Sequence, residues 1–238
     1  MSLQGRSEVD YVILAGGNGK RLRSLDGGLD PAADWTPKPL IEIKGKPLIE
    51  LQMDSVLRTA KVDGIIIAAG YKHDKVKEVL GAEYRGVPIQ YSIEERLLGT
   101  AGALRKALRL STAEAFIVSN CDDITDADYA EMVRRHQGSK MVASVMVARA
   151  RMPFGVVKFH PDGRVSGFTE KPLLDEYVSC GQYVMKREVI KYFPEEGDLE
   201  RAVFPKMIMD GVLGSYRHGG MWVTVNTVKD AETAEALL

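Results

Sequence analysis

Short apolar runs alternate with segments of helical periodicity through the first half of the chain. Three continuous apolar runs have the length of a buried strand, at residues 11–14, 64–69 and 115–119. Between the first two runs, apolar side chains recur at helical spacing from Ile49 to Ala60, just after Pro47, a residue favoured at a helix start. Continuous apolar strands separated by helices are typical of a parallel sheet that is covered on both faces. The pattern therefore predicts an α/β fold with a doubly wound, mostly parallel mixed sheet.

The other elements of this half follow the same alternation. Helices are expected at residues 72–80, 102–110 and 126–137, and a strand at residues 87–92. Asp126 is expected to cap the last of these helices, because Asp is favoured at the N-cap position.

The pattern changes after Lys140. Strands are expected at residues 141–150, 155–159, 164–170, 178–186 and 214–218, and helices at residues 187–193, 199–209 and 230–238. The His160-Pro161-Asp162-Gly163 segment has the composition of a turn, so the strands on either side of it predict a β-hairpin. No linker rich in Gly, Ser or Pro divides the chain, which is therefore expected to form a single domain over residues 1–238.

The glycine-rich run that follows the first strand is the clearest candidate for chemistry. It reads Leu14-Ala15-Gly16-Gly17-Asn18-Gly19-Lys20-Arg21-Leu22. Its glycines let backbone N–H groups approach a ligand without obstruction by a Cβ, and two cations follow, so the run predicts a cradle for a polyphosphate. The Walker motif is excluded because Leu14 and Arg21 stand where it needs Gly and Ser or Thr. The dinucleotide fingerprint is excluded because Leu22 replaces its third glycine.

Other polar segments are expected to reach the same edge of the sheet. Lys38 lies between Pro37 and Pro39, which stiffen the backbone and make the lysine a fixed charge for phosphate. Residues 94–102 and 120–122 follow two of the predicted strands, as the glycine run follows the first. Ligands of such sheets bind outside the carboxyl ends of the strands, so these segments predict one shared site.

In these motifs and their order, the chain resembles the sugar-phosphate nucleotidylyltransferases, also called nucleotide-sugar pyrophosphorylases. The resemblance covers nearly the whole chain from about Val9. It is carried by the glycine run, Pro37-Lys38-Pro39-Leu40, Gly99-Thr100-Ala101-Gly102-Ala103-Leu104, Asn120-Cys121-Asp122, Phe168-Thr169-Glu170-Lys171-Pro172, Cys180-Gly181-Gln182-Tyr183 and residues 222–227. It implies a Rossmann-like sheet of the nucleotide-diphospho-sugar transferase type, with a nucleotide-binding half at about residues 9–140. The sugar-binding half, at about residues 141–238, is expected to carry a small β-hairpin and helix insertion.

The reaction implied by this resemblance is nucleotidyl transfer with Mg²⁺ as the cofactor. An oxygen of a sugar 1-phosphate attacks the α-phosphorus of a nucleoside triphosphate in line, and pyrophosphate leaves. Because the nucleophile is already an anion, the site needs cations and N–H donors rather than a general base. The implied catalytic residues are Arg21, Lys38 and Asp122, and the implied nucleotide-binding residues are Leu14, Ala15, Gly16, Gly17, Gly19, Lys20, Glu94, Gly99 and Thr100.

The implied metal site departs from the family pattern. Asp122, at a strand end opposite the triphosphate, is the implied Mg²⁺ ligand, because a carboxylate is a hard oxygen donor. The family usually supplies a second carboxylate near its C-terminal aromatic residue, but Thr224 stands there. Some cytidylyltransferase relatives carry their Asp at the position of Asn226. We expect the amide oxygen of Asn226 to serve instead, and the affinity for Mg²⁺ to be lower as a result.

Glu94 is the expected reader of the base, about five residues before Gly99 in the family pattern. Thymidylyl and uridylyl enzymes tend to have Gln there. An ionised carboxylate only accepts hydrogen bonds, and guanine offers it two donors where cytosine offers one. The expected nucleotide is therefore GTP, with CTP next, and the Gly99-Thr100 turn is expected to lie against the base.

The sugar-phosphate site is implied at Glu170, Lys171, Gly181 and Glu200. Lys171 is expected to bind the phosphate of the sugar 1-phosphate, and Glu170 a sugar hydroxyl. Gly181 permits close approach of the sugar, and Glu200 matches an acidic position that often faces it. The sequence identifies neither the sugar nor the pathway.

The composition limits the classes of partner that the chain is expected to bind. The 238 residues include 32 Lys and Arg against 33 Asp and Glu, and the net charge of −1 gives no general attraction to nucleic acid or to an anionic membrane. With two cysteines, no membrane-length apolar stretch and no signal peptide, a cytoplasmic location is expected. The expected partners are the nucleoside triphosphate and the sugar 1-phosphate, with no nucleic acid and no membrane. The oligomeric state stays open, and a homodimer is compatible with the sequence.

Two other functions stay open. One is a nucleotide-sugar-binding regulatory protein of the same fold with weak or no turnover, which the neutral Thr224 and Asn226 favour. The other is a cytidylyltransferase for a non-sugar phosphate such as phosphocholine, which needs an aromatic or acidic cage for the quaternary ammonium. The candidate cage residues are Trp35, Trp222, Tyr183 and Tyr216.

Overall fold

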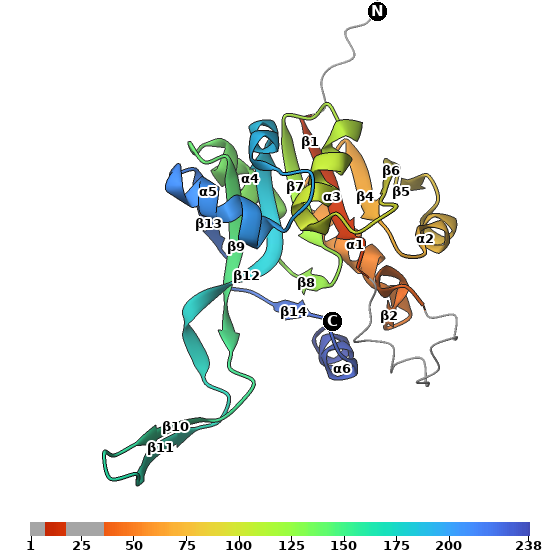
Figure 1. Cartoon of the computed structure of the whole chain (residues 1–238). Helices are drawn as coiled ribbons and strands as arrows, with labels where there is room; N and C mark the ends of the chain where they lie inside the picture. Colours follow the sequence, from red (N-terminus) through yellow and green to blue (C-terminus); the bar gives the residue numbers. More distant parts are fainter. Residues whose placement is uncertain (1–7, 18–35) are drawn as a thin grey trace, which may run out of the picture.

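The central feature of the fold is a mixed β-sheet (Figure 1). The computed structural model describes residues 8–17 and 36–238, and in that part of the chain the main sheet has eight strands. Their order is β13 (Leu213–Arg217), β9 (Ala143–Arg151), β12 (Leu173–Lys186), β7 (Ala115–Asn120), β1 (Val9–Ala15), β4 (Gly64–Ala69), β6 (Val87–Ile93) and β5 (Glu83–Tyr84). Neighbouring strands are parallel except where β12 or β5 takes part. The predicted α/β fold with a mostly parallel mixed sheet is confirmed.

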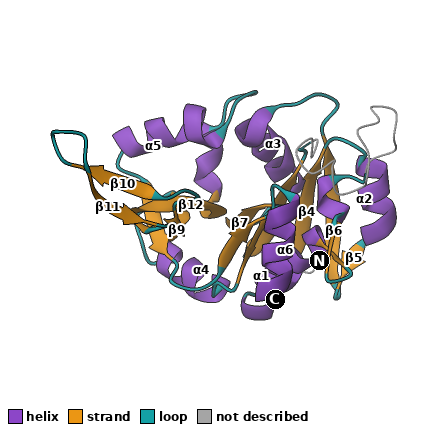
Figure 2. Cartoon of the chain, turned by 90° about the horizontal axis from the view of Figure 1, so that it is seen from below, coloured by secondary structure: helices purple, strands orange, loops and turns teal. Residues whose placement is uncertain are grey.

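Helices cover both faces of this sheet (Figure 2). In the described residues they are α1 (Leu48–Thr59), α2 (His73–Leu80), α3 (Gly99–Ala107), α4 (Tyr129–Gln137), α5 (Phe204–Met209) and α6 (Val228–Leu237), with shorter turns at Lys38–Leu40, Leu108–Leu110, Arg187–Tyr192 and Leu199–Val203. Alternating side chains of β1 enter two different cores: Tyr11 and Ile13 pack with α1 and α4, and Val12 packs with α3. This double burial explains why β1 is apolar without interruption. Across the same residues, no helix has both the length and the hydrophobicity of a membrane span.

The structure corrects the predicted start of α4. The helix begins at Tyr129, and its N-cap is Asp128, whose side chain accepts the backbone N–H of Glu131 at 2.9 Å. Asp126 instead accepts the backbone N–H of Met221 at 2.7 Å. Both aspartates are good caps by type, but Asp126 is engaged by this contact with a distant segment. Two other predicted helices are also less regular. The helix predicted at residues 187–193 is a 3₁₀ turn, and the helix predicted at residues 199–209 is a π-turn followed by α5.

A β-hairpin projects from one end of the body (Figure 1). β10 (Val156–Phe159) and β11 (Val165–Thr169) pair antiparallel, and the backbone N–H of Gly163 closes the expected turn by donating to the carbonyl of His160 at 3.0 Å. The far ends of β9 and β12 pair with each other and carry this hairpin away from the main sheet. The predicted hairpin is confirmed. We refer to residues 152–177 as the arm.

Two short strands bring the C-terminal segment to the main sheet. β8 (Asp123–Thr125), just after β7, pairs antiparallel with β14 (Trp222–Thr224), so that Thr224 lies opposite Asp123. The chain then enters α6, whose start is closed by a capping box between Thr227 and Asp230. A second small ribbon, β2 (Glu42–Ile43) with β3 (Lys46–Pro47), precedes α1. The sequence pattern predicts neither ribbon, yet the first of them positions the candidate site.

Candidate functional site

The carboxyl ends of four neighbouring strands are level with one another. Leu14 of β1 lies opposite Asn120 of β7. Ala15 of β1 lies opposite Ala69 of β4, which in turn lies opposite Ile93 of β6. The segments that follow β1, β6 and β7 therefore start at one edge of the sheet, as the sequence predicts.

A lysine, a carboxylate and an amide meet at this edge. Lys38 Nζ lies 2.5 Å from Asp122 Oδ2 and 3.0 Å from Asn226 Oδ1, and it donates to both. The side chains of Lys38 and Asp122 are 12% and 21% exposed, so this ion pair is shielded from much of the solvent. Charge-assisted hydrogen bonds of this kind are stronger than neutral ones. We refer to Lys38, Asp122 and Asn226 as the lysine centre.

The prolines around Lys38 fix its position. Residues Lys38–Leu40 form a single 3₁₀ turn, in which the Leu40 N–H donates to the Pro37 carbonyl at 2.8 Å. Pro37 has a φ of −64°, which its ring favours, and Pro39 is buried. The buried proline anchors the turn while the neighbouring lysine reaches Asp122. The backbone that the sequence predicts to be stiff is thus a turn in the structure, and phosphate binding by Lys38 stays a prediction.

Asn226 is held from two sides. The backbone N–H of Val225 donates to the carbonyl of Asp122 at 2.7 Å, which ties the end of β14 to the end of β7. The side-chain amide nitrogen of Asn226 donates to Thr224 Oγ1 at 2.9 Å. This bond leaves the amide oxygen for Lys38, so the oxygen that the sequence assigns to Mg²⁺ accepts an ammonium proton in the structure.

Protein donors for a metal at this edge are few. Where the structure describes the chain, no three His, Cys, Asp or Glu side chains gather closely enough to hold a metal ion. Lys38 engages Oδ2 of Asp122. The other oxygen of that carboxylate fits the role of a single protein ligand, because Mg²⁺ commonly keeps waters and substrate phosphates as its remaining ligands.

Asp123, beside the lysine centre, is a polar residue for which the sequence indicates no role in the site. It is 4% exposed, and its carboxylate accepts from Trp222 Nε1 at 3.0 Å and from Asn120 Nδ2 at 3.4 Å. Burial, and then the negative charge of Asp122, raise the pKa of Asp123 to about 7 against the effect of these hydrogen bonds. The raised pKa means that Asp123 holds a proton more readily than an exposed aspartate does, which lowers the negative charge next to Asp122. The only signal in the sequence is its place after Asp122 at a strand end, which equally suits a capping residue.

Gly181 faces this buried acid. Its φ is +65°, and a Cβ there would overlap Asp123 Oδ2 and Asn120 Nδ2. The packing of the protein's own polar side chains is therefore sufficient to require a glycine. The expected contact of Gly181 with a sugar stays a prediction.

Glu94 lies beside the beginning of the glycine run. Its Oε1 is 2.8 Å from the position that a Cβ of Gly16 would occupy, so Gly16 leaves room for this carboxylate. Its Oε2 accepts the backbone N–H of Leu98 at 3.1 Å. Burial raises the pKa of Glu94, while the Leu98 hydrogen bond and the charge of Lys106 oppose the rise. Glu94 is thus next to the beginning of the glycine run, and its contact with a base stays a prediction.

The Gly99-Thr100 turn is clamped by a loop from the second half of the chain. Gly99 has a φ of +72°, and a Cβ there would overlap the carbonyl of Gly197. Thr100 Oγ1 accepts the backbone N–H of Leu199 at 2.9 Å. Loop packing therefore accounts for this glycine and fixes the start of α3, and its contact with a base stays a prediction.

The predicted sugar-phosphate residues lie in different places. Glu200 is exposed, with its Oε1 3.4 Å from the hydroxyl of the buried Tyr183. Glu170 and Lys171 lie on the arm, with their charged groups 3.9 Å apart and their side chains 60% and 54% exposed. Lys171 adopts the left-handed conformation, with a φ of 44°. Among the contacts of the described residues, none joins these three charged side chains to the lysine centre.

Part of the predicted phosphate cradle lies outside the described residues, namely Gly19, Lys20 and Arg21. The beginning of the run is described, and it passes from the buried Ala15 to the exposed Gly17. The chain therefore leaves the core at the first two glycines, as a loop that approaches a ligand must do. Contact of the run with a polyphosphate stays a prediction.

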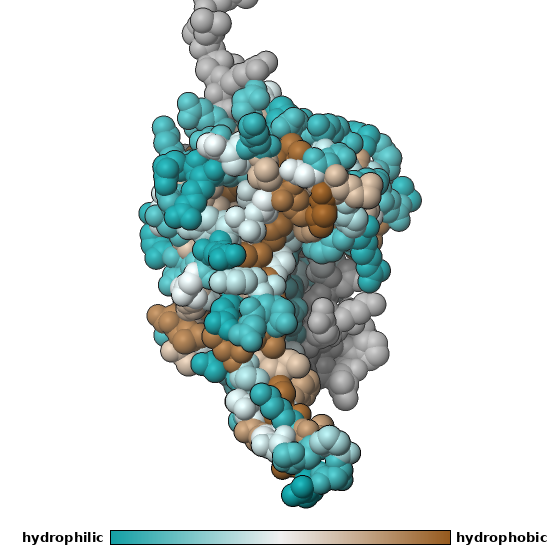
Figure 3. Space-filling view, turned by 90° about the vertical axis from the view of Figure 1, so that its left-hand side faces the viewer, coloured by the Kyte–Doolittle hydropathy of each residue, from teal (hydrophilic) through white to brown (hydrophobic). Residues whose placement is uncertain are grey.

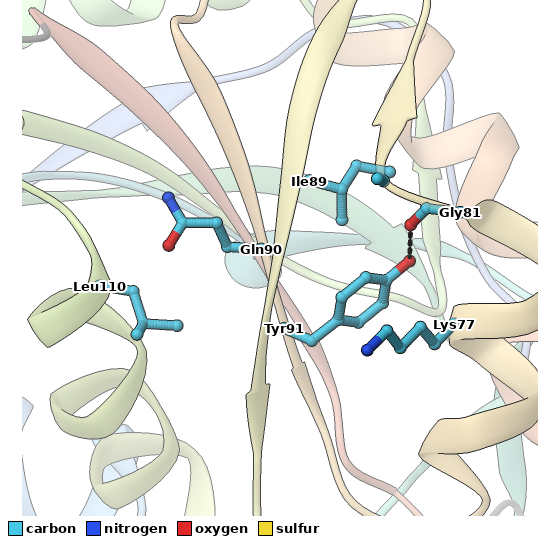
Figure 4. A pocket seen from close by; sticks show the side chains of 7 residues that line it. Lys77, Gly81, Ile89, Gln90, Tyr91 and Leu110 are labelled. Atoms are coloured by element: carbon cyan, nitrogen blue, oxygen red, sulfur yellow. Dashed lines mark hydrogen bonds between the residues drawn. The ribbon is translucent and has the colours of Figure 1, made fainter.

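A hollow of about 570 Å³ lies elsewhere, along β6 (Figure 4). It is lined by Lys77, Gly81, Ala82, Ile89, Gln90, Tyr91 and Leu110. Figure 4 shows Gln90 and Leu110 on one side of the strand and Tyr91 on the other, where the Tyr91 hydroxyl donates to the Gly81 carbonyl at 2.6 Å. None of the predicted site residues lines this hollow, and it carries no argument for the site.

Comparison with known proteins decides the family. The model of the nucleotidyl transferase family matches residues 10–237. This chain belongs to the nucleotidyl transferase family. The family suggested by the sequence motifs is therefore confirmed, and the lysine centre lies inside the matched region of this nucleotidyl transferase.

The relatives of this nucleotidyl transferase include longer proteins. It is 32% identical to the mannose-1-phosphate guanyltransferase of Emericella nidulans, over 95% of this chain and 63% of that protein. It is also 32% identical to the mannose-1-phosphate guanyltransferase beta-B of Xenopus laevis, over 92% of this chain and 61% of that protein. The chain thus spans about three fifths of the length of these curated relatives.

A solved structure shares the fold of this nucleotidyl transferase. HddC from Yersinia pseudotuberculosis has a TM-score of 0.70 and 24% identity, over 96% of this chain and 98% of that chain. HddC has also been solved complexed with GMP-PN. At this identity the likeness shows the fold alone.

Proposed function

We propose that this chain transfers a nucleotidyl group from a nucleoside triphosphate to a sugar 1-phosphate. The lysine centre carries the proposal, because Lys38 is fixed between Asp122 and Asn226 at the sheet edge where the glycine run begins. A fixed ammonium beside a polyphosphate loop is suited to neutralise charge on a phosphoryl group in transfer. Membership of the nucleotidyl transferase family supports this reaction class.

In the proposed reaction, an oxygen of the sugar 1-phosphate attacks the α-phosphorus of the triphosphate. A new P–O bond joins the two phosphates, the bond from the α-phosphorus to the bridging oxygen breaks, and pyrophosphate leaves with that electron pair. The nucleophile is an anion, so no side chain has to remove a proton. We assign the α-phosphate to Lys38 and the leaving pyrophosphate to Lys20 and Arg21.

Mg²⁺ is the proposed cofactor, held by Asp122 and by oxygens of the triphosphate. When bound, it would neutralise phosphate charge as a Lewis acid. Because Lys38 already contacts Asp122, the carboxylate is shared between two cations, and the protein alone is expected to bind Mg²⁺ weakly. Asn226 is assigned mainly to positioning Lys38, since its amide oxygen accepts from that ammonium.

GTP is the proposed nucleotide, with CTP next. Glu94 lies beside Gly16, and its ionised carboxylate can accept from both N1–H and the N2 amino group of guanine. Relatives named for guanylyl transfer to mannose 1-phosphate support this choice, and they make mannose 1-phosphate the first sugar to test. The residues proposed for the sugar-phosphate side stay Glu170, Lys171, Gly181 and Glu200.

A nucleotide-sugar-binding protein without turnover is the second candidate. It is favoured by Asn226, because this neutral residue bound to Lys38 adds no second negative charge for a metal ion. Transfer to phosphocholine is less favoured, because Tyr183 is buried, Trp222 donates to Asp123, and the ring of Tyr216 faces Arg135 at 5.5 Å. Trp35 lies outside the described residues, and the three aromatic rings that the structure describes offer no open cage.

The test is a matrix of nucleoside triphosphates against sugar 1-phosphates, with pyrophosphate and nucleotide sugar measured together. We expect GTP to yield the two products in equal amounts. Calorimetric binding of GDP-mannose without pyrophosphate from any pair would favour the non-catalytic candidate instead. A clear preference for UTP or dTTP would contradict the assignment of Glu94 as the reader of the base.

A further inference from the structure

We infer that the arm is an interface through which two copies of this chain associate. In the described residues, eight of the fifteen exposed large hydrophobic side chains lie on the arm: Met152, Phe154, Val156, Phe159, Val165, Phe168, Leu173 and Tyr177. Figure 3 shows apolar residues, in brown, along this projection at the lower end of the molecule. An apolar concentration of this kind on a projecting element is typical of a protein–protein interaction site.

The strand register places several of these side chains on one face of the hairpin. Val157 lies opposite Phe168, and Phe159 lies opposite Val165. Directly opposed residues of an antiparallel pair share a face, so these four side chains form one apolar surface. Gly155 leaves room for the Phe168 ring, because a Cβ there would overlap it.

A two-stranded hairpin cannot bury such a face by itself, and in isolation it is marginally stable in water. Phe154, Phe159 and Phe168 are 71%, 66% and 64% exposed. At roughly 200 Å² per ring, the three expose about 400 Å², and the other apolar side chains of the arm add a comparable area. This sum approaches the roughly 800 Å² that each partner contributes to a standard interface. The arm is therefore large enough to support association.

The charges of the arm favour a second copy over another class of partner. The arm carries three Lys or Arg and four Asp or Glu, namely Lys158, Arg164, Lys171, Asp162, Glu170, Asp175 and Glu176. It lacks the basic excess that binds nucleic acid or an anionic membrane. In a two-fold dimer the same apolar face packs on both sides, and mixed rim charges can pair across the axis.

The edge of the hairpin favours a closed dimer over a growing chain of copies. The strand register shifts between Lys158 and Phe159, which interrupts the ladder of the hairpin. Irregularities of this kind and a lysine on the strand both discourage addition of further strands at an open edge. The apolar face, rather than the edge, is therefore the surface of contact.

Sedimentation equilibrium of the full chain tests this interface. We expect the wild type at twice 26.2 kDa in the micromolar range. Phe159→Ser with Val165→Ser, at positions that are 66% and 60% exposed, should weaken the dimer at least about a hundredfold, because each apolar contact is removed twice. Ile208→Ser with Met209→Ser is the matched control: these side chains are 64% and 82% exposed on α5, and the control should stay dimeric.

Phe154→Ser, outside the paired strands, is a second variant that leaves the hairpin ladder intact, and it should weaken the dimer about tenfold. A wild type that sediments as a monomer would overturn the inference, whether or not that monomer binds to anionic vesicles. Arm variants that dimerise as tightly as the wild type, or a control that dissociates equally, would do the same. The measurement needs no substrate, so its outcome is independent of the proposed function.

Discussion

The lysine centre and the arm each present a lysine and a carboxylate, but in opposite surroundings. Lys38 is 12% exposed and donates to Asp122 at 2.5 Å. Lys171 is 54% exposed, and its only ion pair among the described residues is with Glu170 at 3.9 Å. Exposed pairs of that length contribute little to stability, whereas a shielded, charge-assisted pair fixes both partners.

This difference indicates that the fold holds the residues assigned to the nucleotide more firmly than the residues assigned to the sugar phosphate. The side assigned to the nucleotide is built from strand ends, a proline-flanked turn and the β8–β14 ribbon, so the fold itself sets its geometry. The side assigned to the sugar phosphate includes two exposed residues of the arm, Glu170 and Lys171, and the arm projects from the body of the molecule. Substitutions in the centre should therefore change the chemical step, and substitutions on the arm should change sugar-phosphate binding or association.

Asp122→Asn is expected to have the largest effect among substitutions that test this contrast, lowering kcat about 10²- to 10³-fold. The change removes the anion that holds Lys38 and the proposed Mg²⁺ ligand. Pyrophosphate release at saturating substrates measures it. Asp126→Asn is the control, because that nearby carboxylate accepts from Met221 and has no proposed part in transfer. Equal losses in the two variants would indicate general disruption rather than a specific role of Asp122.

Lys171→Met should have the next largest effect. It is expected to raise KM for the sugar 1-phosphate about tenfold or more while KM for GTP stays constant, because a charge-assisted phosphate contact is lost. Initial rates with each substrate varied in turn give both constants. Lys158→Met removes the same charge elsewhere on the arm and serves as the control. An unchanged KM in Lys171→Met would remove the arm from the sugar-phosphate site.

Glu94→Gln tests the part of the site that is assigned to the nucleotide, namely the reading of the base by Glu94. The amide can still accept from the Leu98 N–H, but it offers guanine one acceptor where the carboxylate offers two. We expect the ratio of kcat/KM for GTP to that for UTP to fall about tenfold or more. Competition between the two nucleotides in one reaction measures this ratio directly. A ratio equal to that of the wild type would show that another residue reads the base.

Substitution of His136 tests how the stability of the folded body that carries the lysine centre depends on pH. Its effect should be the smallest of the four substitutions. Burial, and then the charge of Lys186, lower the pKa of His136 to about 4 from an ordinary value of 6.5. The unfolded chain therefore takes up this proton at a higher pH than the folded chain does. Stability from this group is complete above pH 6.5 and is lost as the pH falls toward 4. Thermal unfolding of wild type and His136→Gln across that range should show a shallower pH dependence in the variant, and parallel curves would contradict the assignment.

Much of the fold could be predicted because its signals are local. The apolar runs of β1, β4 and β7 are continuous, since both faces of each strand are covered. The Lys38 turn follows from its two prolines, and the shared edge follows from strand direction alone. These features depend on residues that are close together in the chain.

The rest of the site depends on contacts between distant segments, which the pattern of one strand or helix does not contain. Asn226 meets Lys38, 188 positions away, only because β14 pairs with β8. Gly99 and Gly181 have the sequence context of ligand-facing glycines, but the spaces beside them are filled by Gly197 and by Asp123. Asp126 likewise has the residue type of a helix cap, but its partner is the distant Met221.

The most direct test of the lysine centre is the turnover of Lys38→Met with GTP and mannose 1-phosphate. The methionine keeps an unbranched side chain of similar length and removes the ammonium that Asp122 and Asn226 hold. We predict that the wild type forms equal amounts of pyrophosphate and GDP-mannose, and that the folded variant, checked by its thermal unfolding, is at least about 10²-fold slower. A folded Lys38→Met variant that turns over at the wild-type rate would contradict the account.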